Sequence, residues 1–384
     1  MSCNDRWPRR HAHALARVTC LLVSSIAILR CGVDSQAAPI VLDPTTTLST
    51  FDAGGSLDAF INGGLTLGGL EVTGPGSVHV VGADGSVGGT SSRLQLFHST
   101  GLGTAVPVGA PAPIALNTRG FDLTPNPADG NLYVAGTLRN PLPVPGLYGF
   151  DPAGVAPVSS FATTTLGWAT SGITFDAAGA SALVTTDGAG AGSVPNGLYA
   201  VPAGGPQVPL VTLGPLPAGI PSGTDDHVIT LDGRTIVVGD GSHDLWDATG
   251  GAGSVSLLVD LDPLLLPLGA RLGVGGVRAA VEPGTGDIFI AWGLSVGADI
   301  VRVKDDGSAA SVFARGMDGE RIRDLDFGPA SDGSGRHSLY VSAAMANGGG
   351  TIYEITLVPE PAGSALVLIA AALVSCGRGI RVGR

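Results

Sequence analysis

An internal repeat constrains this chain more than any other feature of its 384 residues. The clearest copies read GFDLTPNPADGNLYVAG from Gly120, GITFDAAGASALVTTD from Gly172, HVITLDGRTIVVGD from His227 and GVRAAVEPGTGDIFIAWG from Gly276. In each copy, apolar residues alternate with small or polar ones on both sides of a turn that contains Pro, Asp or Gly, which is typical of a β-hairpin. The copies recur about every 45 to 55 residues, a period that indicates an array of similar β units.

Two further strands follow each hairpin. The third is predicted in GLYGFDPAG, GLYAVPAGG, DIVRVKDDG and TIYEITL, and the fourth in PVSSFA, VPLVTL, VSLLVDL and ASVFAR. A clear copy from Arg321 and a degraded one near Gly69 complete a set of six starts, near residues 69, 120, 172, 226, 276 and 321. Four short antiparallel strands per repeat are the unit of a propeller blade, so we predict an all-β, six-bladed β-propeller over residues 38–357.

The last repeat is one strand short, because it ends after TIYEITL at Leu357. The segment from Thr46 to Phe51 has the length, β-branched content and alternation of the missing strand. We predict that it pairs antiparallel with the strand from Thr351 to Leu357. This pairing would close the ring and cover both sheet edges.

The repeat pattern resembles six-bladed propellers of the NHL and SMP-30 type over nearly all of the body, without a diagnostic motif of either family. The resemblance to SMP-30-like lactonases implies a divalent cation at the channel mouth, held by carboxylates and an asparagine. The early blades offer Asn117, Asn126, Asn131, Asn140 and Asn196, and none is predicted to begin an inner strand. Several acidic residues and a histidine are predicted near the channel: Asp122, Asp225, Asp226, His227, Asp324 and Asp326.

Two other motifs are interpreted as loops. The sequence from Gly293 to Gly297 matches G-x-S-x-G, but it joins two predicted strands of one blade, whereas a nucleophile elbow joins a strand to a helix. Asp240, Ser242 and Asp244 are spaced like the start of a calcium loop, but Leu245 stands where an EF-hand requires glycine. We therefore assign no catalytic, cofactor-binding or metal-binding residue. Inner carboxylates that converged within about 2.0 to 2.6 Å of one point would favour a metal-dependent hydrolase instead.

Residues 358–384 carry a second signal. Val358, Pro359, Glu360 and Pro361 precede the apolar run AGSALVLIAAALVS, and Arg378, Arg381 and Arg384 follow it. This order resembles the PEP-CTERM sorting tail of exported bacterial proteins, which implies processing by an exosortase-type membrane peptidase. The predicted C-terminal helix would reach roughly 21 Å across a hydrocarbon core of about 30 Å, which favours a transient span. An ordinary buried C-terminal helix is the alternative.

Residues 1–37 are predicted to be a signal peptide with a helical apolar core. Four arginines precede the apolar stretch from Val18 to Leu29, and small residues place the signal peptidase cut after Ala37. A lipoprotein modified at Cys31 is the alternative, although Arg30 occupies a position where a lipobox needs a small residue.

Between these two ends, the body has no cysteine, since Cys3, Cys20, Cys31 and Cys376 all lie in the leader or the tail. Its 12 basic and 29 acidic residues give it a net charge of −17, which disfavours binding to nucleic acid. We expect an exported binding or structural module at the cell surface or in the extracellular matrix, with a surface polysaccharide or a protein as ligand. The metal-dependent hydrolase, with its site at the channel mouth, is the alternative function.

Overall fold

The computed structural model describes most of the predicted body. The described residues are 39–53, 57, 65–84, 94–109, 116–117, 122–138, 144–155, 158–164, 170–186, 197–212, 224–239, 243–251, 254–268, 276–292, 300–316, 320–345 and 350–357. All belong to the compact unit that begins at Pro39. The predicted leader and tail, with Ala37, Val358, Pro359, Glu360, Pro361, Arg378, Arg381 and Arg384, lie outside them. No helix within the described ranges is long and apolar enough to cross a membrane.

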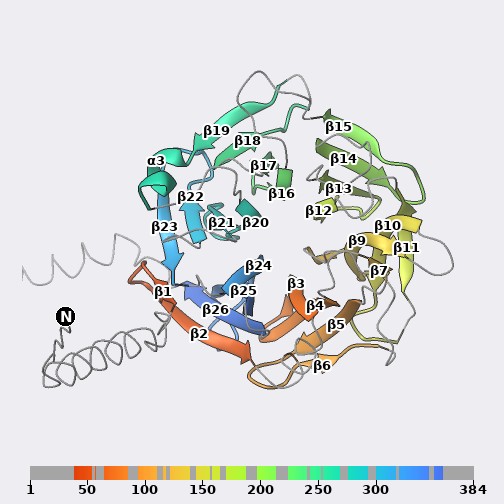
Figure 1. Cartoon of the computed structure of the whole chain (residues 1–384), viewed down its shortest axis with the longest axis horizontal. Helices are drawn as coiled ribbons and strands as arrows, with labels where there is room; N and C mark the ends of the chain where they lie inside the picture. Colours follow the sequence, from red (N-terminus) through yellow and green to blue (C-terminus); the bar gives the residue numbers. More distant parts are fainter. Residues whose placement is uncertain are drawn as a thin grey trace, which may run out of the picture. The chain divides into compact units, whose positions relative to one another are not determined.

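Six antiparallel sheets form the blades, numbered here in chain order (Figure 1). Blade 1 contains β3 (Leu65–Gly74), β4 (Ser77–Asp84), β5 (Leu94–Ser99) and β6 (Val106–Pro107). Blade 2 contains β7 (Leu116–Asn117), β8 (Thr124–Pro125), β9 (Leu132–Leu138), β10 (Val144–Phe150) and β11 (Ser159–Thr163). Blade 3 contains β12 (Thr170–Phe175), β13 (Ser181–Thr186), β14 (Gly197–Pro202) and β15 (Val208–Thr212).

The second half of the chain repeats this order. Blade 4 contains β16 (Thr224–Ile229), β17 (Thr235–Gly239), β18 (Asp244–Asp247) and β19 (Ser256–Asp260). Blade 5 contains β20 (Gly276–Val281), β21 (Ile288–Trp292), β22 (Ile300–Val303) and β23 (Ala310–Arg315). Blade 6 contains β24 (Glu320–Pro329), β25 (His337–Met345) and β26 (Gly350–Leu357). The innermost strands contact one another in turn around the ring, and β24 meets β3, so the predicted six-bladed propeller is confirmed.

The predicted closing strand is also confirmed. Strand β2 (Thr46–Ala53) pairs antiparallel with β26, with Thr46 opposite Leu357 and Ala53 opposite Thr351. The buried carboxylate of Asp52 then reaches blade 1, where it accepts a hydrogen bond from the Gly103 amide at 2.6 Å and another from the Ser99 hydroxyl. The N-terminal strand therefore bonds to the last blade through its backbone and to the first blade through one side chain.

Two elements were not predicted. Strand β1 (Ile40–Val41) pairs with β23 and extends blade 5 to five strands. A short helix α3 (Asp262–Leu265) and a 3₁₀ turn (Leu266–Leu268) follow blade 4. A two-residue strand is too short to show the period-2 alternation by which strands are recognised in a sequence.

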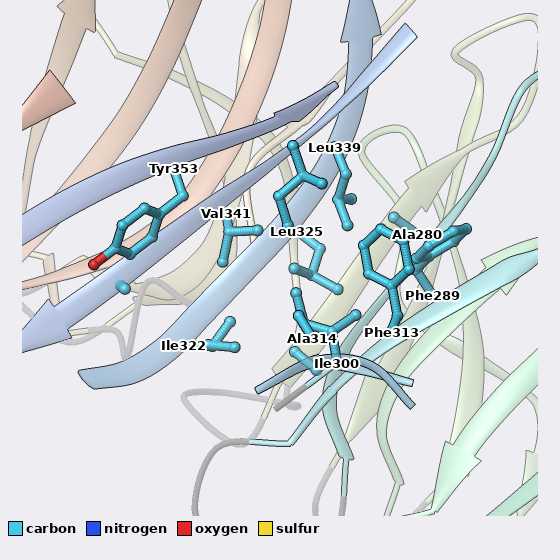
Figure 2. Close-up of a cluster of buried hydrophobic side chains, with 13 residues drawn as sticks. Ala280, Phe289, Ile300, Phe313, Ala314, Ile322, Leu325, Leu339, Val341 and Tyr353 are labelled. Atoms are coloured by element: carbon cyan, nitrogen blue, oxygen red, sulfur yellow. The ribbon is translucent and has the colours of Figure 1, made fainter. Parts of the chain in front are cut away.

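Each junction between neighbouring blades holds its own cluster of buried apolar side chains, because both faces of every sheet are covered by another blade. The junction between blades 5 and 6 contains thirteen such residues, and Figure 2 shows Phe289 and Phe313 from blade 5 beside Leu325 and Leu339 from blade 6. Phe289 packs edge-on against Phe313, with ring centroids 4.8 Å apart. Among the described residues, the cluster between blades 3 and 4 has only three fully buried members, Leu198, Val237 and Ala248.

Candidate functional site: an acidic cavity in the central channel

A cavity of about 200 Å³ lies where the innermost strands of all six blades meet. Its wall is made of backbone and side chains from these strands and from the residues beside them. The lining residues are Leu70, Glu71, Asp122, Leu123, Thr124, Ile173, Thr174, Asp226, His227, Val228, Ile229, Ala279, Ala280, Val281, Asp324, Leu325 and Asp326. Five of them are acidic, so this part of the channel concentrates acidic groups.

Four of the carboxylates connect neighbouring blades. An innermost strand is the edge of its sheet, so alternate amide N–H groups point away from its single partner strand. In blade 1, the amides of Leu70 and Val72 donate to Asp324 Oδ2 at 2.6 Å and to Asp326 Oδ2 at 2.7 Å, both from blade 6. These aspartates satisfy edge groups that no strand reaches, and we call such contacts carboxylate clasps.

The same contact recurs at two other junctions. Asp122, which precedes β8 of blade 2, accepts a hydrogen bond from the Ile173 amide of blade 3 at 2.5 Å. Asp226 of blade 4 accepts one from the Ala279 amide of blade 5 at 2.8 Å. Carboxylate clasps therefore occur at every second junction, between blades 6 and 1, 2 and 3, and 4 and 5.

The intervening junctions are joined differently. Between blades 5 and 6, the buried guanidinium of Arg278 lies with Nε 3.7 Å from Asp324 Oδ1. Between blades 3 and 4, Gly172 lies so close to Asp226 and His227 that a Cβ there would overlap Asp226 Oδ1 and stand 3.1 Å from His227 Nδ1. Glycine at position 172 thus allows the closest approach of the two inner strands.

Burial and mutual repulsion favour protonation of these acids. Burial raises the pKa of Asp226 to about 7, and the charge of Asp122 adds to this effect, which Arg278 opposes. Burial likewise raises the pKa of Asp326 to about 7. The pKa values of Glu71 and Asp324 are also raised well above their ordinary ranges, first by burial and then by neighbouring carboxylates. A cluster of this kind retains protons at neutral pH unless another cation replaces them.

His227 is the unusual member of the cavity wall. It is only 3% exposed, and burial together with the charge of Arg278 lowers its pKa to about 3, so the ring is neutral. Neither Nδ1 nor Nε2 has a hydrogen-bond partner among the described residues. A neutral imidazole offers one donor and one acceptor, and a buried polar group without a partner costs about 1–3 kcal/mol.

The structure brings together most of the channel residues predicted from the sequence: Asp122, Asp226, His227, Asp324 and Asp326. The side chain of Asp225 lies outside the described part of the chain. Glu71 and Arg278 were missed, although both lie near the start of a repeat and the same rule of position would have found them. Of the asparagines considered in the sequence, Asn117 lies in β7, which with β8 pairs with β9 as the inner strand of blade 2, but β7 begins at Leu116.

The carboxylates do not converge in the way that a metal site requires. Within the described ranges, no group of three or more His, Cys, Asp or Glu side chains could hold a metal ion. The cavity nevertheless has five acidic residues among its lining, so its wall is not apolar.

The first loop motif lies between paired strands, as predicted, whereas the second extends into a strand, because Asp244 and Leu245 begin β18. Residues 293–297 fall between β21 and β22, which pair antiparallel, and the motif itself lies outside the described residues. Asp240 and Ser242, between β17 and β18, also lie outside them, whereas the neighbouring His243 contacts Asp262 with 2.7 Å between Nδ1 and Oδ1.

No protein-family model matches the sequence, and no curated protein matches it. Several solved structures have a similar fold. Regucalcin, a calcium-binding protein from Agrobacterium tumefaciens, is 16% identical with a TM-score of 0.49, over 82% of this chain and 98% of that one. An inactive variant of virginiamycin B lyase from Staphylococcus aureus, solved with quinupristin, is 11% identical with a TM-score of 0.47, over 82% and 100% of the two chains. These likenesses concern the fold alone.

Proposed function

We propose that the chain is an exported β-propeller that acts as a binding module at the cell surface or in the extracellular matrix. The acidic cavity of the channel carries the binding part of this proposal, because it combines a defined volume, five carboxylates and an unsatisfied histidine. The closed ring supports it as well, since the pairing of β2 with β26 completes blade 6, whose inner strand β24 lines the cavity. Ligand sites are commonly concave, preformed and furnished with a few polar groups.

The export part of the proposal is supported by the sequence. A predicted signal peptide ending at Ala37 and a tail that resembles the PEP-CTERM signal flank a body without cysteine. In this proposal a signal peptidase and an exosortase-type membrane peptidase are the processing partners, and the C-terminal helix holds the chain in the membrane only transiently. A surface polysaccharide or a protein is the proposed ligand.

The export proposal is tested by the intact mass of the protein recovered from the surface fraction of its own host. We expect a chain that lacks residues 1–37 and ends near Pro359, Glu360 and Pro361. Replacement of Glu360 by alanine should leave the uncut precursor in the membrane fraction, whereas the matched change Glu282→Ala should not. A mature surface protein that still ends at Arg384 would overturn the proposal.

A further inference from the structure

The end of strand β26 determines where the ring can meet a membrane. Neighbouring strands of a blade are antiparallel, so the first and third strands run the same way and end on one side of the ring, which we call the turn side. Strand β26 is the third strand of blade 6 and ends on this side at Leu357. Only residues 358–361 separate it from the apolar run that begins at Ala362. Four residues span at most about 14 Å, so a tail held in the membrane keeps this point of the ring close to the bilayer.

Two surfaces adjoin Leu357, and the turn side is the less suited to a bilayer. It carries exposed aspartates in turns of blades 2 to 6: Asp129, Asp176, Asp232, Asp306 and Asp332. Two of them form ion pairs, Asp232 with Arg234 and Asp332 with Arg336. Removing a charged group from water is costly, and an ion pair offsets this cost only in part. The turn side therefore favours contact with water over contact with lipid.

The outer rim beside Leu357 has the opposite character. It is formed by β1 and β2, the outermost strands of blades 5 and 6 (Figure 1), and we call it the closing rim. Ile40 and Leu42 are 55% and 44% exposed there, while Val41 between them packs against the core. The exposed side chains of β2 are uncharged hydroxyl groups: Thr47, Ser49 and Thr50.

The closing rim is also nearly free of charge. From Pro39 to Phe51 the chain has one charged residue, Asp43, in a body with a net charge of −17. Asp43 Oδ1 accepts hydrogen bonds from the Thr45 amide at 2.9 Å and from the Thr45 hydroxyl at 2.6 Å, and its Oδ2 lies 3.7 Å from Arg302 Nη1. Apolar side chains gain stability on leaving water, and hydroxyl groups lose less than carboxylates do. The closing rim is therefore the surface near Leu357 that favours contact with lipid.

We propose that the chain that still carries its tail stands edge-on at the membrane, with the closing rim against the lipid bilayer and the channel axis parallel to it. Ile40 and Leu42 enter the headgroup region, as the apolar residues of interfacial segments do. Both ends of the channel then stay open to the solution, so the cavity is accessible before the tail is cut. This inference rests on the proposed role of the tail and specifies the surface by which the tethered ring meets the membrane.

Fluorescence quenching in vesicles tests this orientation. The body has no cysteine, so the chain without its leader, made with Glu360→Ala and Cys376→Ser, accepts one reporter dye at a time. Thr50→Cys places the dye on the closing rim, away from the tether, Ala177→Cys on the turn side of blade 3, and Val208→Cys on the outer strand of blade 3. The vesicles contain phosphatidylethanolamine, phosphatidylglycerol and a lipid with a nitroxide quencher on its headgroup.

We expect the quencher to lower the fluorescence at position 50 at least about twofold and to leave positions 177 and 208 nearly unchanged, because only the closing rim reaches the headgroups. Replacing both Ile40 and Leu42 by serine should reduce the quenching at position 50 to the level at position 208, while the chain still floats with the vesicles. The matched change of Val208 and Leu210 to serine removes exposed apolar side chains from the outer strand of blade 3 and should leave the quenching at position 50 unchanged.

The outcomes that overturn the inference differ from the one that refutes the tether. Stronger quenching at position 177 than at position 50 would show that the turn side meets the membrane. Equal quenching at all three positions would show that the ring has no preferred orientation. Either result would refute the edge-on orientation and leave the tail as an anchor. A chain that does not float with the vesicles would refute the anchoring role of the tail, and the inference would fall with it.

Discussion

The junction between blades 5 and 6 and the junction between blades 3 and 4 hold the same ring by different means. The first is packed with thirteen buried apolar side chains, among them Phe289 and Phe313 (Figure 2). At the second, described polar groups take a larger part: the Thr224 hydroxyl donates to the Thr186 carbonyl at 2.9 Å, and Gly172 faces His227. Among the described residues, apolar packing is thus light at the junction between blades 3 and 4, beside which the unsatisfied histidine lies, whereas each of the other five junctions holds at least eight buried apolar side chains.

The test with the largest expected effect removes the two N-terminal strands that pair with blades 5 and 6. Deletion of residues 39–53 takes β1 and β2 away, exposes β26 as a sheet edge and removes Phe51 from the core. We expect a chain that is unfolded or aggregated in circular dichroism and size-exclusion measurements. Deletion of residues 39–42 alone, which removes only β1, should leave a cooperative melting transition. An unchanged melting curve after the longer deletion would show that closure does not stabilise the ring.

A matched pair of substitutions compares the two junctions directly. Leu339→Ala, in the large cluster, should lower the free energy of unfolding by about 4–5 kcal/mol, the upper end of the range for buried leucine. Leu198→Ala, in the small cluster, should cost about 2–3 kcal/mol, because fewer apolar neighbours lose contacts. Urea denaturation measures both. Equal costs would mean that the described clusters misrepresent how packing is distributed around the ring.

The carboxylate clasps allow a finer test. Asp326→Ala leaves the Val72 amide without an acceptor and should cost about 1–3 kcal/mol. Asp326→Asn keeps an acceptor and removes a buried charge, so its unfolding free energy should stay close to that of the unaltered protein. If both variants were as stable as the unaltered protein, the hydrogen bond from the Val72 amide to Asp326 would not contribute to stability.

A further test is the dependence of the melting temperature on pH. The pKa values of Asp226 and Asp326 are raised to about 7 in the folded chain, from an ordinary value of 3.8. The folded state therefore holds more protons between about pH 4 and pH 7, so the contribution of these groups to stability falls as pH rises through that window. We expect a lower melting temperature at pH 7.5 than at pH 5, and a smaller difference in Asp326→Asn. A higher melting temperature at pH 7.5 would contradict the raised pKa values.

The fold was predictable because a blade is a local pattern. Turn residues and alternation within about 50 residues reveal its strands, and one missing strand at Leu357 pointed to the segment at Thr46. The site was predictable only as a list of acids near the inner strands. The clasps depend on the register between strands of different blades, as between Leu70 and Asp324, and no local pattern encodes a contact between residues so distant in sequence. The unpaired state of His227 likewise depends on Gly172 in the neighbouring blade.

The place of β26 within its sheet determines how the ring responds to force. Strand β26 ends at Leu357 and lies between β25 and β2, so it is hydrogen-bonded along both sides. A tether attached beyond Leu357 that pulls along the strand shears the backbone hydrogen bonds to β25 and to β2 at the same time. An edge strand, in contrast, could be peeled away one hydrogen bond at a time. The chain thus leaves the ring from an internal strand, and resistance to detachment under flow or drag comes from the closing pair itself.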